Sequence, residues 1–336
     1  MSLTNRAFVP VTGPSLLDPF AAIGEHNGFG VDHRGDATVI DTSLGVARFD
    51  PGAQGTQLIL NARTPAELQL LTDLFAQRLA GLSLSVEVAW TMSSGTTPPN
   101  QVLAAVMDVM PLSANFARVR LTGDFTAFTR SDAGWHFRLL FDPDQLGWPT
   151  CDATSVTQWP GGSESWHRPP YTVHRISIEE TWKDVDIMLH QGGRITAWYD
   201  WIAPGDEVAL HEPGGSKQPT AGWVRLLSDE TALPVILEII ENASVDMRGQ
   251  VLFAIRDAPD AQQVNSFCSF DIWLLDMIDD SALRHALNHL DLPDGDRHIF
   301  FAAERKQAAE ARDWLRRRGL ISEDAKAAAY WTRTLN

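Results

Sequence analysis

The chain has 336 residues, of which 44% are hydrophobic and 21% charged, and its formal net charge is −16. This length predicts two or three domains, and the composition is typical of a soluble globular protein. The acidic balance excludes non-specific nucleic-acid binding, because that requires a basic face. No apolar run approaches the roughly 20 residues of a membrane span, and the N-terminus lacks the layout of a signal peptide. We therefore expect a cytoplasmic protein without membrane insertion.

The cysteines limit the redox chemistry that the protein can carry by itself. Cys151 and Cys268 lie far apart and outside any CxxC or metal-ligand spacing. They provide neither a disulfide framework nor an iron–sulfur site. We expect no bound metal, and any redox work must come from a bound organic cofactor.

The first hundred residues predict a short extension followed by a small α+β unit. Residues 1–27 contain three prolines and show no clear periodicity, so they are interpreted as an N-terminal extension. From residue 28 onward, "ATVIDTSLGVARFD" and "GTQLILNA" alternate apolar and polar residues as half-buried strands do. "TPAELQLLTDLFAQRL" then starts a helix, with Thr64 as cap, Pro65 at the first helical position and Glu67 in a capping box. With the linker around "SSGTTPPNQ", the unit is expected to span residues 28–101.

The rest of the chain changes its pattern twice. Residues 102–220 hold about six short strands separated by turns and no long helix, which predicts a small antiparallel barrel. Residues 221–336 alternate strands with helices, which predicts a parallel sheet covered by helices. The expected fold class is therefore multi-domain, with a small α+β unit, an antiparallel six-stranded β-barrel and a C-terminal α/β domain.

A strand tip in the α/β domain is a candidate nucleotide site. The apolar strand Val224 to Leu227 leads into Asp229, Glu230 and Thr231, and Pro234 lies in the first turn of the next helix. Phosphates and nucleotides bind where a strand tip meets a helix N-terminus in such sheets. An ordinary capped turn explains the same residues, and no GxGxxG fingerprint is present. The spacing alone leaves both interpretations open.

Several stretches in one order resemble the siderophore-interacting protein family. They are "ARVRLTGDFTAF", "WHFRLLFDP", "TQWPGG", "YT" at 171–172, "GDEVALHEPGGS", "DETALP", "FAAERKQAAEARDWLRRRGL" and "AYWTR", between about residues 102 and 333. The family consists of FAD-dependent ferric-siderophore reductases related to ferredoxin–NADP reductases. The resemblance implies that the barrel binds FAD and that residues 221–336 bind NADPH or NADH. Residues 28–82 resemble a small accessory domain of unknown function found alongside this family.

The resemblance also implies roles for a strand in the barrel. In the family, an Arg-x-Tyr-Thr/Ser strand contacts FAD, with Arg at the pyrophosphate, Tyr on the isoalloxazine ring and Thr at the reactive flavin edge. Tyr171 and Thr172 match this motif and are the expected catalytic residues. Arg168 stands one residue out of register, with Pro169 at the expected position, so either Arg168 or Arg175 contacts the phosphates. A guanidinium suits phosphate oxygens, and an aromatic face suits a flavin ring.

The glycine turn at Gly193 and the short helix expected after it should offer free backbone amides to the FAD pyrophosphate, as the matching family segment does. The full set of expected cofactor-binding residues is Arg168, Tyr171, Thr172, Val173, Arg175, His190, Gly193, Ile195, Thr196, Ala197, Asp229, Glu230, Thr231 and Arg256.

Two basic features bear on the nicotinamide cofactor and the substrate. Arg256 and Asp257 end the second strand of the α/β domain, where an arginine suits the 2′-phosphate of NADPH and an acid the ribose 2′-hydroxyl of NADH. We expect NADPH slightly more than NADH. Arg305 and Lys306 follow a strand tip and belong to a basic C-terminal helix, which is more often a solvated face that balances a helix C-terminus. The functional alternative is that these two residues help to attract an anionic ferric siderophore.

Three functions follow from these observations. The first is an NAD(P)H-dependent reductase that releases Fe(II) from a ferric siderophore, because a flavin converts a two-electron hydride into single electrons. The second is a general flavin-dependent NAD(P)H oxidoreductase, which the shifted arginine favours. The third is a non-catalytic flavin- or siderophore-binding protein, which the N-terminal addition and "AAE" at 302–304 favour. A monomer is expected, with a dimer as the alternative.

Overall fold

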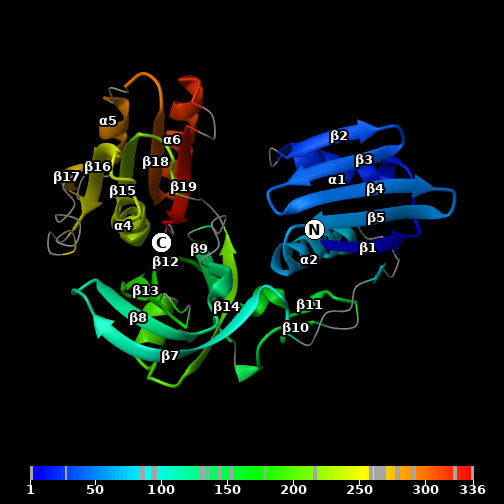
Figure 1. The fold of residues 1–336 in the computed structure, drawn as a ribbon, viewed down its shortest axis with the longest axis horizontal. Coiled ribbons are helices and arrows are strands. Elements are labelled where there is room, and N and C mark those ends of the chain that lie inside the picture. The colour runs from blue at the N-terminus through cyan, green and yellow to red at the C-terminus, as the bar shows by residue number, and fades with distance from the viewer. Residues whose placement is uncertain are drawn as a thin grey trace. The chain divides into compact units, whose positions relative to one another are not determined.

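The computed structural model describes most of the chain and divides it into two compact units (Figure 1). The first unit comprises Met1–Val102, Leu139–Pro169 and Ala209–Glu212. The second comprises Leu103–Arg138, Pro170–Val208 and Pro213–Asn336. The described residues are 3–26, 29–82, 88–91, 97–128, 134, 136–142, 145–151, 154–177, 179, 181–214, 218–256, 260, 270–276, 281–289, 293–320 and 324–333.

The first unit is built around a six-stranded antiparallel sheet in the order β2-β3-β4-β5-β1-β6. Its strands are β1 (Leu3–Val9), β2 (Gly30–Arg34), β3 (Ala37–Thr42), β4 (Gly45–Gly52), β5 (Gly55–Ala62) and β6 (Ala89–Trp90). The helices α1 (Pro14–His26) and α2 (Pro65–Gly81) share one apolar core with alternate residues of these strands. The segment expected as a separate extension therefore supplies an interior strand, β1, between β5 and β6, and a helix to the same sheet domain.

The start of α2 confirms the helix signal in the sequence. The Thr64 hydroxyl accepts a hydrogen bond from the Glu67 amide at 3.1 Å. The Glu67 carboxylate reaches back to the amide of Arg63 rather than to that of Thr64. The last turn of the helix carries Arg78, which suits the negative end of the helix dipole. The first unit also contains the short pair β10 (Thr150–Cys151) and β11 (Thr157–Gln158).

The barrel expected from the sequence is confirmed as a closed six-stranded barrel in the order β12-β13-β8-β7-β14-β9. The pairs β12–β13, β12–β9, β13–β8 and β7–β8 run antiparallel. A six-residue helix, α3 (Arg194–Tyr199), precedes the last strand. The strands are β7 (Gln101–Pro111), β8 (Phe116–Gly123), β9 (His136–Leu140), β12 (Pro170–Ile176), β13 (Trp182–Met188) and β14 (Glu207–Gly214).

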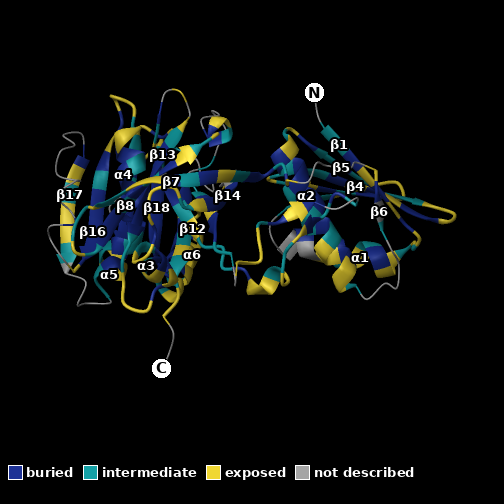
Figure 2. Ribbon diagram, turned by 90° about the horizontal axis from the view of Figure 1, so that it is seen from below, coloured by how far each residue is buried: buried dark blue, intermediate teal, exposed yellow. Residues whose placement is uncertain are grey.

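The C-terminal domain is a five-stranded parallel sheet in the order β17-β16-β15-β18-β19. The helix α4 packs on one face, and α5 and α6 pack on the other, so the central strands are buried (Figure 2). The elements are β15 (Trp223–Asp229), α4 (Leu233–Glu241), β16 (Arg248–Ile255), β17 (Phe270–Asp276), α5 (Ala282–Asn288), β18 (Arg297–Glu304), α6 (Arg305–Arg317) and β19 (Ala325–Trp331).

The second unit joins the barrel to the parallel sheet through shared packing. Phe116 of β8 is buried in the core around α4, and Met188 of β13 packs against the same core. This arrangement brings one side of the barrel to the parallel sheet within one compact unit. Within the described part of the chain, no helix is long and apolar enough to cross a membrane.

Candidate functional site

The strand β12 presents the two expected catalytic residues on opposite faces. Tyr171 is paired with Phe137 of β9, and Thr172 is paired with His136. Residues directly opposite each other in an antiparallel pair share a face, and successive residues alternate. The rings of Tyr171 and Phe137 lie 6.4 Å apart, and burial raises the pKa of the Tyr171 phenol above its usual value. Thr172 is buried and shares its face with His136.

His136 connects this face of the barrel to the last strand of the parallel sheet. Its Nε2 lies 2.8 Å from the hydroxyl of Tyr330 in β19, at hydrogen-bonding distance. Burial, helped by the charge of Lys326, lowers the pKa of His136 to about 4, so the ring is neutral at pH 7. Sequence reasoning missed His136 as a site residue, although the strand "WHFRLLFDP" was part of the family resemblance. The feature that identifies His136 is its pairing with Thr172, and this pairing is known only once the strand register is known.

The titration of His136 predicts a pH-dependent loss of stability. Because its pKa in the folded protein is depressed, the unfolded chain binds more protons between about pH 4 and 6.5. Folding stability therefore falls as the pH drops through that window, by up to about 1.4 kcal/mol per pH unit for this one proton. Urea unfolding of the wild type and of His136→Gln at pH 6.5, 5.5 and 4.5 measures this difference. Equal slopes for the two proteins would contradict the prediction.

A β-bulge follows the Tyr-Thr pair. The register shifts between Val173, opposite Val185, and Arg175, opposite Asp184, so His174 is the extra residue. His174 is buried, and its Nδ1 has no hydrogen-bond partner among the described residues. Burial lowers the pKa of His174, while the charge of Asp186 opposes this shift. Arg175 is exposed on the same strand.

One threonine side chain stabilises the glycine turn before α3 by hydrogen bonds. The Thr196 hydroxyl accepts a hydrogen bond from the His190 amide and donates one to the His190 carbonyl, both at 2.9 Å. A Cβ added at Gly193 would lie 2.7 Å from the His190 ring, so the two residues are closely packed. Ile195 is buried and Ala197 exposed. The Thr196 side chain is therefore engaged in the turn, and the groups that remain for a phosphate are the backbone amides of the first turn.

At the tip of β15, hydrogen bonds to one buried carboxylate connect neighbouring segments of the chain. Asp229 is buried, and its Oδ1 accepts from the amide of Thr231 at 3.0 Å. Its Oδ2 accepts from the Nε1 of Trp331, in β19, at 2.7 Å. Burial raises the pKa of Asp229, and these hydrogen bonds oppose the rise. Asp229 thus joins the strand tip, the turn into α4 and the C-terminal strand.

Next to it, Glu230 and Arg256 form an ion pair. The Arg256 Nε lies 3.2 Å from Glu230 Oε1, and the Arg256 amide donates to Oε2. The Glu230 side chain is 2% exposed and that of Arg256 is 66% exposed. Burial raises the pKa of Glu230, while Arg256 lowers it. The structure therefore brings Asp229, Glu230, Thr231 and Arg256 together; Asp257, the acid considered for NADH, lies outside the described residues.

The C-terminal segment is tied to the tip of β18 as well. Glu304 accepts from the amides of Lys306 at 2.6 Å and of Arg333 at 3.2 Å. The Arg305 Nε donates to the Thr332 hydroxyl at 3.0 Å. Arg305 and Lys306 are both exposed at the start of α6, beside the carboxyl end of the parallel strands.

Arg168 lies in the first unit, and its guanidinium is 4.4 Å from the centroid of the Trp159 ring. Trp159 also contacts the rings of Trp166 and His211, at 5.4 and 5.5 Å. Arg168 precedes Tyr171 by three residues in the sequence, and the structure places it on an aromatic cluster. Sequence reasoning did not foresee the stacking partner, which "TQWPGG" contributes.

A pair of histidines was also overlooked in the sequence. His285 and His289 are four residues apart around α5, and their rings lie 4.0 Å apart. His289 Nδ1 lies 2.9 Å from the His285 carbonyl. Among the described residues, no group of three or more potential metal ligands includes this pair.

Comparison with known proteins identifies relatives of this chain. Residues 105–217 match the family model described as "Siderophore-interacting FAD-binding domain", and residues 221–334 match "Siderophore-interacting protein". Ferric vibriobactin reductase ViuB of Vibrio cholerae is 28% identical over 243 residues, which cover 67% of this chain and 87% of ViuB. The NADPH-dependent ferric-chelate reductase of Escherichia coli is 26% identical over 236 residues, which cover 67% of this chain and 91% of that reductase.

Solved structures agree with these matches. A siderophore utilization protein from T. fusca has a TM-score of 0.60 and 26% identity over 70% of this chain and 94% of that chain. The siderophore-interacting protein SipS from Aeromonas hydrophila has a TM-score of 0.58 and 21% identity over 70% of this chain and 93% of that chain, which supports the fold. The matched 70% of this chain therefore shares its fold with these proteins. The chain belongs to the siderophore-interacting protein family.

Proposed function

We propose that this protein is an FAD-dependent NAD(P)H:ferric-siderophore reductase that releases Fe(II) from siderophores during iron acquisition. The observation that carries the proposal is the meeting of β12 with the carboxyl ends of the parallel strands. Thr172 lies opposite His136, which bonds Tyr330, and the next residue, Trp331, bonds Asp229. The strand expected to contact FAD and the strand tip expected to bind the nicotinamide cofactor thus belong to one connected set of contacts.

The residues around β12 fit a flavin dinucleotide. Tyr171 supplies an aromatic ring, and Arg175 is exposed and forms no ion pair with any other described residue. The buried Nδ1 of His174 has no hydrogen-bond partner within the described part of the chain, which leaves a polar atom beside the strand. Arg168 and Arg175 are both candidates for the phosphates, and Val173 and the backbone from Gly193 to Ala197 complete the proposed FAD site.

FAD held by these residues would supply the chemistry that links a two-electron hydride donor, NAD(P)H, to a one-electron acceptor, Fe(III). The residues of this chain would position the partners. Asp229 orients the turn at Thr231 and the indole of Trp331, and Glu230 holds Arg256 at the end of β16. Arg305 and Lys306 add positive charge where an anionic ferric siderophore would approach. We also propose a cytoplasmic location and a monomeric chain.

The visible spectrum of the purified protein with FAD is the first test. We expect a yellow protein that bleaches anaerobically on addition of NADPH or NADH and then reduces ferric siderophores, measured with an Fe(II)-specific chelator. A bleached protein that reduces quinones or dyes but no ferric siderophore above a free-flavin control supports the general oxidoreductase instead. A protein that binds flavin or siderophore without oxidising NAD(P)H supports a non-catalytic role.

Arg256 predicts a preference for NADPH. A guanidinium that is 66% exposed at the end of β16 suits the 2′-phosphate, which NADH lacks. We expect Arg256→Gln to raise the KM for NADPH by about tenfold and to change the KM for NADH less than about twofold. Arg248→Gln is the matched control, because Arg248 is exposed at the opposite end of the same strand. Equal effects on both cofactors would contradict the assignment.

A further inference from the structure

Within the first unit, α2 of the N-terminal sheet domain contacts residues 155–157, which precede the expected FAD strand β12 in the sequence. From α2, the Gln69 Nε2 donates to the Ser155 carbonyl at 2.9 Å and lies 3.2 Å from the Thr157 hydroxyl. Asp73 accepts from the Thr157 amide at 2.9 Å and from its hydroxyl at 2.6 Å. We call these four residues the α2 clamp. Val156, between its two loop residues, packs against the apolar core of the N-terminal sheet.

Three of the four residues of the α2 clamp are buried, and one of them has a strained backbone. Gln69, Ser155 and Thr157 are 5%, 2% and 6% exposed. Ser155 has a φ of 61°, in the left-handed region that residues other than glycine rarely adopt. Such a conformation costs about 1–3 kcal/mol and persists only where its surroundings fix it. The contacts from α2, together with the pairing of Thr157 with Cys151, hold residues 155–157 in this form.

The clamped loop leads directly to Arg168. Thr157 lies in β11, and Trp159 follows that strand by one residue. The Trp159 ring carries the Arg168 guanidinium at 4.4 Å, and the Trp166 indole donates to the Pro160 carbonyl at 2.8 Å. These contacts all lie within the first unit. The Arg168 side chain thus stacks on a ring that belongs to the loop held by α2. The backbone on either side of Arg168 is held separately, because His167 and Pro169 bond residues 141 and 139.

We propose that the N-terminal domain positions Arg168 for cofactor binding, with Gln69 and Asp73 acting through Thr157 and Trp159. This inference rests on the proposed function, because it takes Arg168 to contact the FAD phosphates. Without the clamp, the loop at residues 155–159 populates several conformations, and only a fraction of the molecules presents the Arg168 side chain correctly on Trp159. The apparent dissociation constant of FAD then rises in inverse proportion to that fraction.

Thr157→Val tests the inference in the full-length protein. The change keeps the side-chain shape and removes the hydroxyl that bonds Asp73. Thr72→Val is the matched control: Thr72 is buried on the same helix, and its hydroxyl accepts a hydrogen bond from Asn5 inside the N-terminal sheet domain. We expect similar losses of Tm for the two variants. The FAD dissociation constant should rise about tenfold for Thr157→Val and stay within about twofold for Thr72→Val.

A double-mutant cycle with Arg168→Ala tests whether the α2 clamp affects FAD binding through Arg168. If the clamp acts through Arg168, Thr157→Val has no further effect on FAD affinity once Arg168 is absent. Intrinsic tryptophan fluorescence of the FAD-free protein supplies an independent signal, because Trp159 and Trp166 lie in the affected segment. We expect it to change in Thr157→Val and not in Thr72→Val.

Three outcomes would overturn the inference. They are an unchanged FAD dissociation constant in Thr157→Val, equal losses of FAD affinity in both threonine variants, or additive effects of Thr157→Val and Arg168→Ala. A wild-type protein that binds no FAD would overturn the proposed function itself, and the wild-type titration, done first, separates that result from the other three.

Discussion

Lys183→Met is expected to raise the free energy of unfolding at pH 7 by about 1–3 kcal/mol, the usual cost of burying a polar group without a hydrogen bond. Lys183 is 0% exposed in β13, and its Nζ has no hydrogen-bond partner among the described residues. The amine lies 3.3 Å from the centroid of the Phe137 ring and 3.8 Å from that of Phe128. Methionine fills the same space and brings no charge into this aromatic surrounding.

The direction in which stability changes with pH follows from the pKa of Lys183. Burial lowers the pKa of Lys183 well below its usual value, so the amine binds its proton more weakly in the folded protein than in the unfolded chain. The unfolded chain therefore holds the extra proton between the lowered pKa and about 10.5, and wild-type stability rises with pH through that window. The advantage of Lys183→Met should shrink as the pH is raised from 7 toward 10. Chemical denaturation at several pH values measures it.

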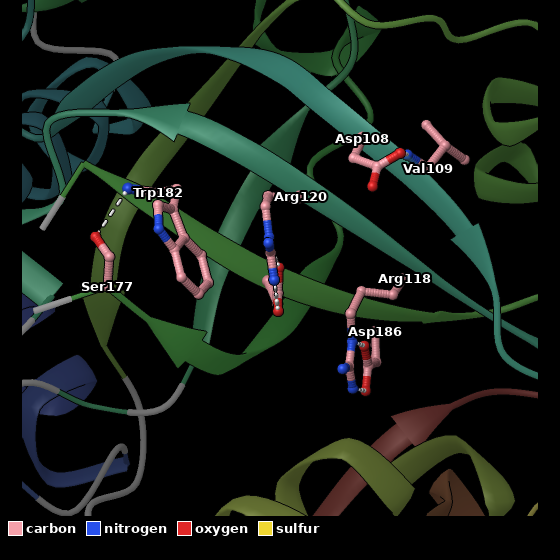
Figure 3. Close-up of polar contacts among 8 residues, drawn as sticks. Asp108, Val109, Arg118, Arg120, Ser177, Trp182 and Asp186 are labelled. Carbon is pink, nitrogen blue, oxygen red and sulfur yellow. Dashed lines mark hydrogen bonds and ion pairs between the residues drawn. The ribbon is translucent and has the colours of Figure 1, made fainter.

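The adjacent residue supplies a control with the opposite sign. Asp184 is also 0% exposed, but its two oxygens accept from Arg120 at 2.7 and 2.9 Å, and Arg120 stacks on Trp182 (Figure 3). Asp184→Ala should destabilise the protein by about 1.5–3 kcal/mol, the usual value for hydrogen bonds to a charged group. If Lys183→Met were destabilising at every pH, the amine would be a charged ammonium held by cation–π contacts, and the prediction would fail.

Local signals in the sequence predicted the elements of this fold but not their partners. The cap at Thr64 and the alternation in "GTQLILNA" depend on neighbours a few residues away, and both are confirmed. The pairing of β1 with β5 joins Leu3 to Ala62, and residues 1–27 carry no pattern that reveals it. A strand in the middle of a sheet is recognised by its partners as much as by its own residues.

The same limit applies to the site. Tyr171 and Thr172 were selected by a local motif, whereas the contact of His136 with Tyr330 spans 194 residues. The bond from Gln69 to Ser155 spans 86 residues and joins two domains that the sequence pattern treats separately. Side chains such as Asp229 were correctly placed at a strand tip, yet the sequence could not show that protein donors occupy both carboxylate oxygens.

Asp229→Asn is expected to raise the KM for NAD(P)H by roughly 10- to 100-fold, because the change removes an acceptor from a buried, charge-assisted contact. An amide has one acceptor oxygen, so it satisfies the amide of Thr231 or the indole of Trp331 but not both. The turn into α4 or the C-terminal strand then loses its fixed position. FAD affinity should change less than about threefold, because β12 keeps its own pairing with β9 and β13.

The variant also decides how Asp229 acts. A carboxylate that bound the nicotinamide cofactor directly would change KM and leave the stability of the free protein untouched. Replacing a carboxylate that organises the strand tip raises KM and lowers stability, and we expect Asp229→Asn to cost about 1–3 kcal/mol of unfolding free energy as well. Trp331→Phe removes the donor on Oδ2, so the Asp229→Asn, Trp331→Phe double variant should lose less than the sum of the single changes. Strict additivity, or a KM effect without any loss of stability, would show that Asp229 is a direct ligand and not an organising residue.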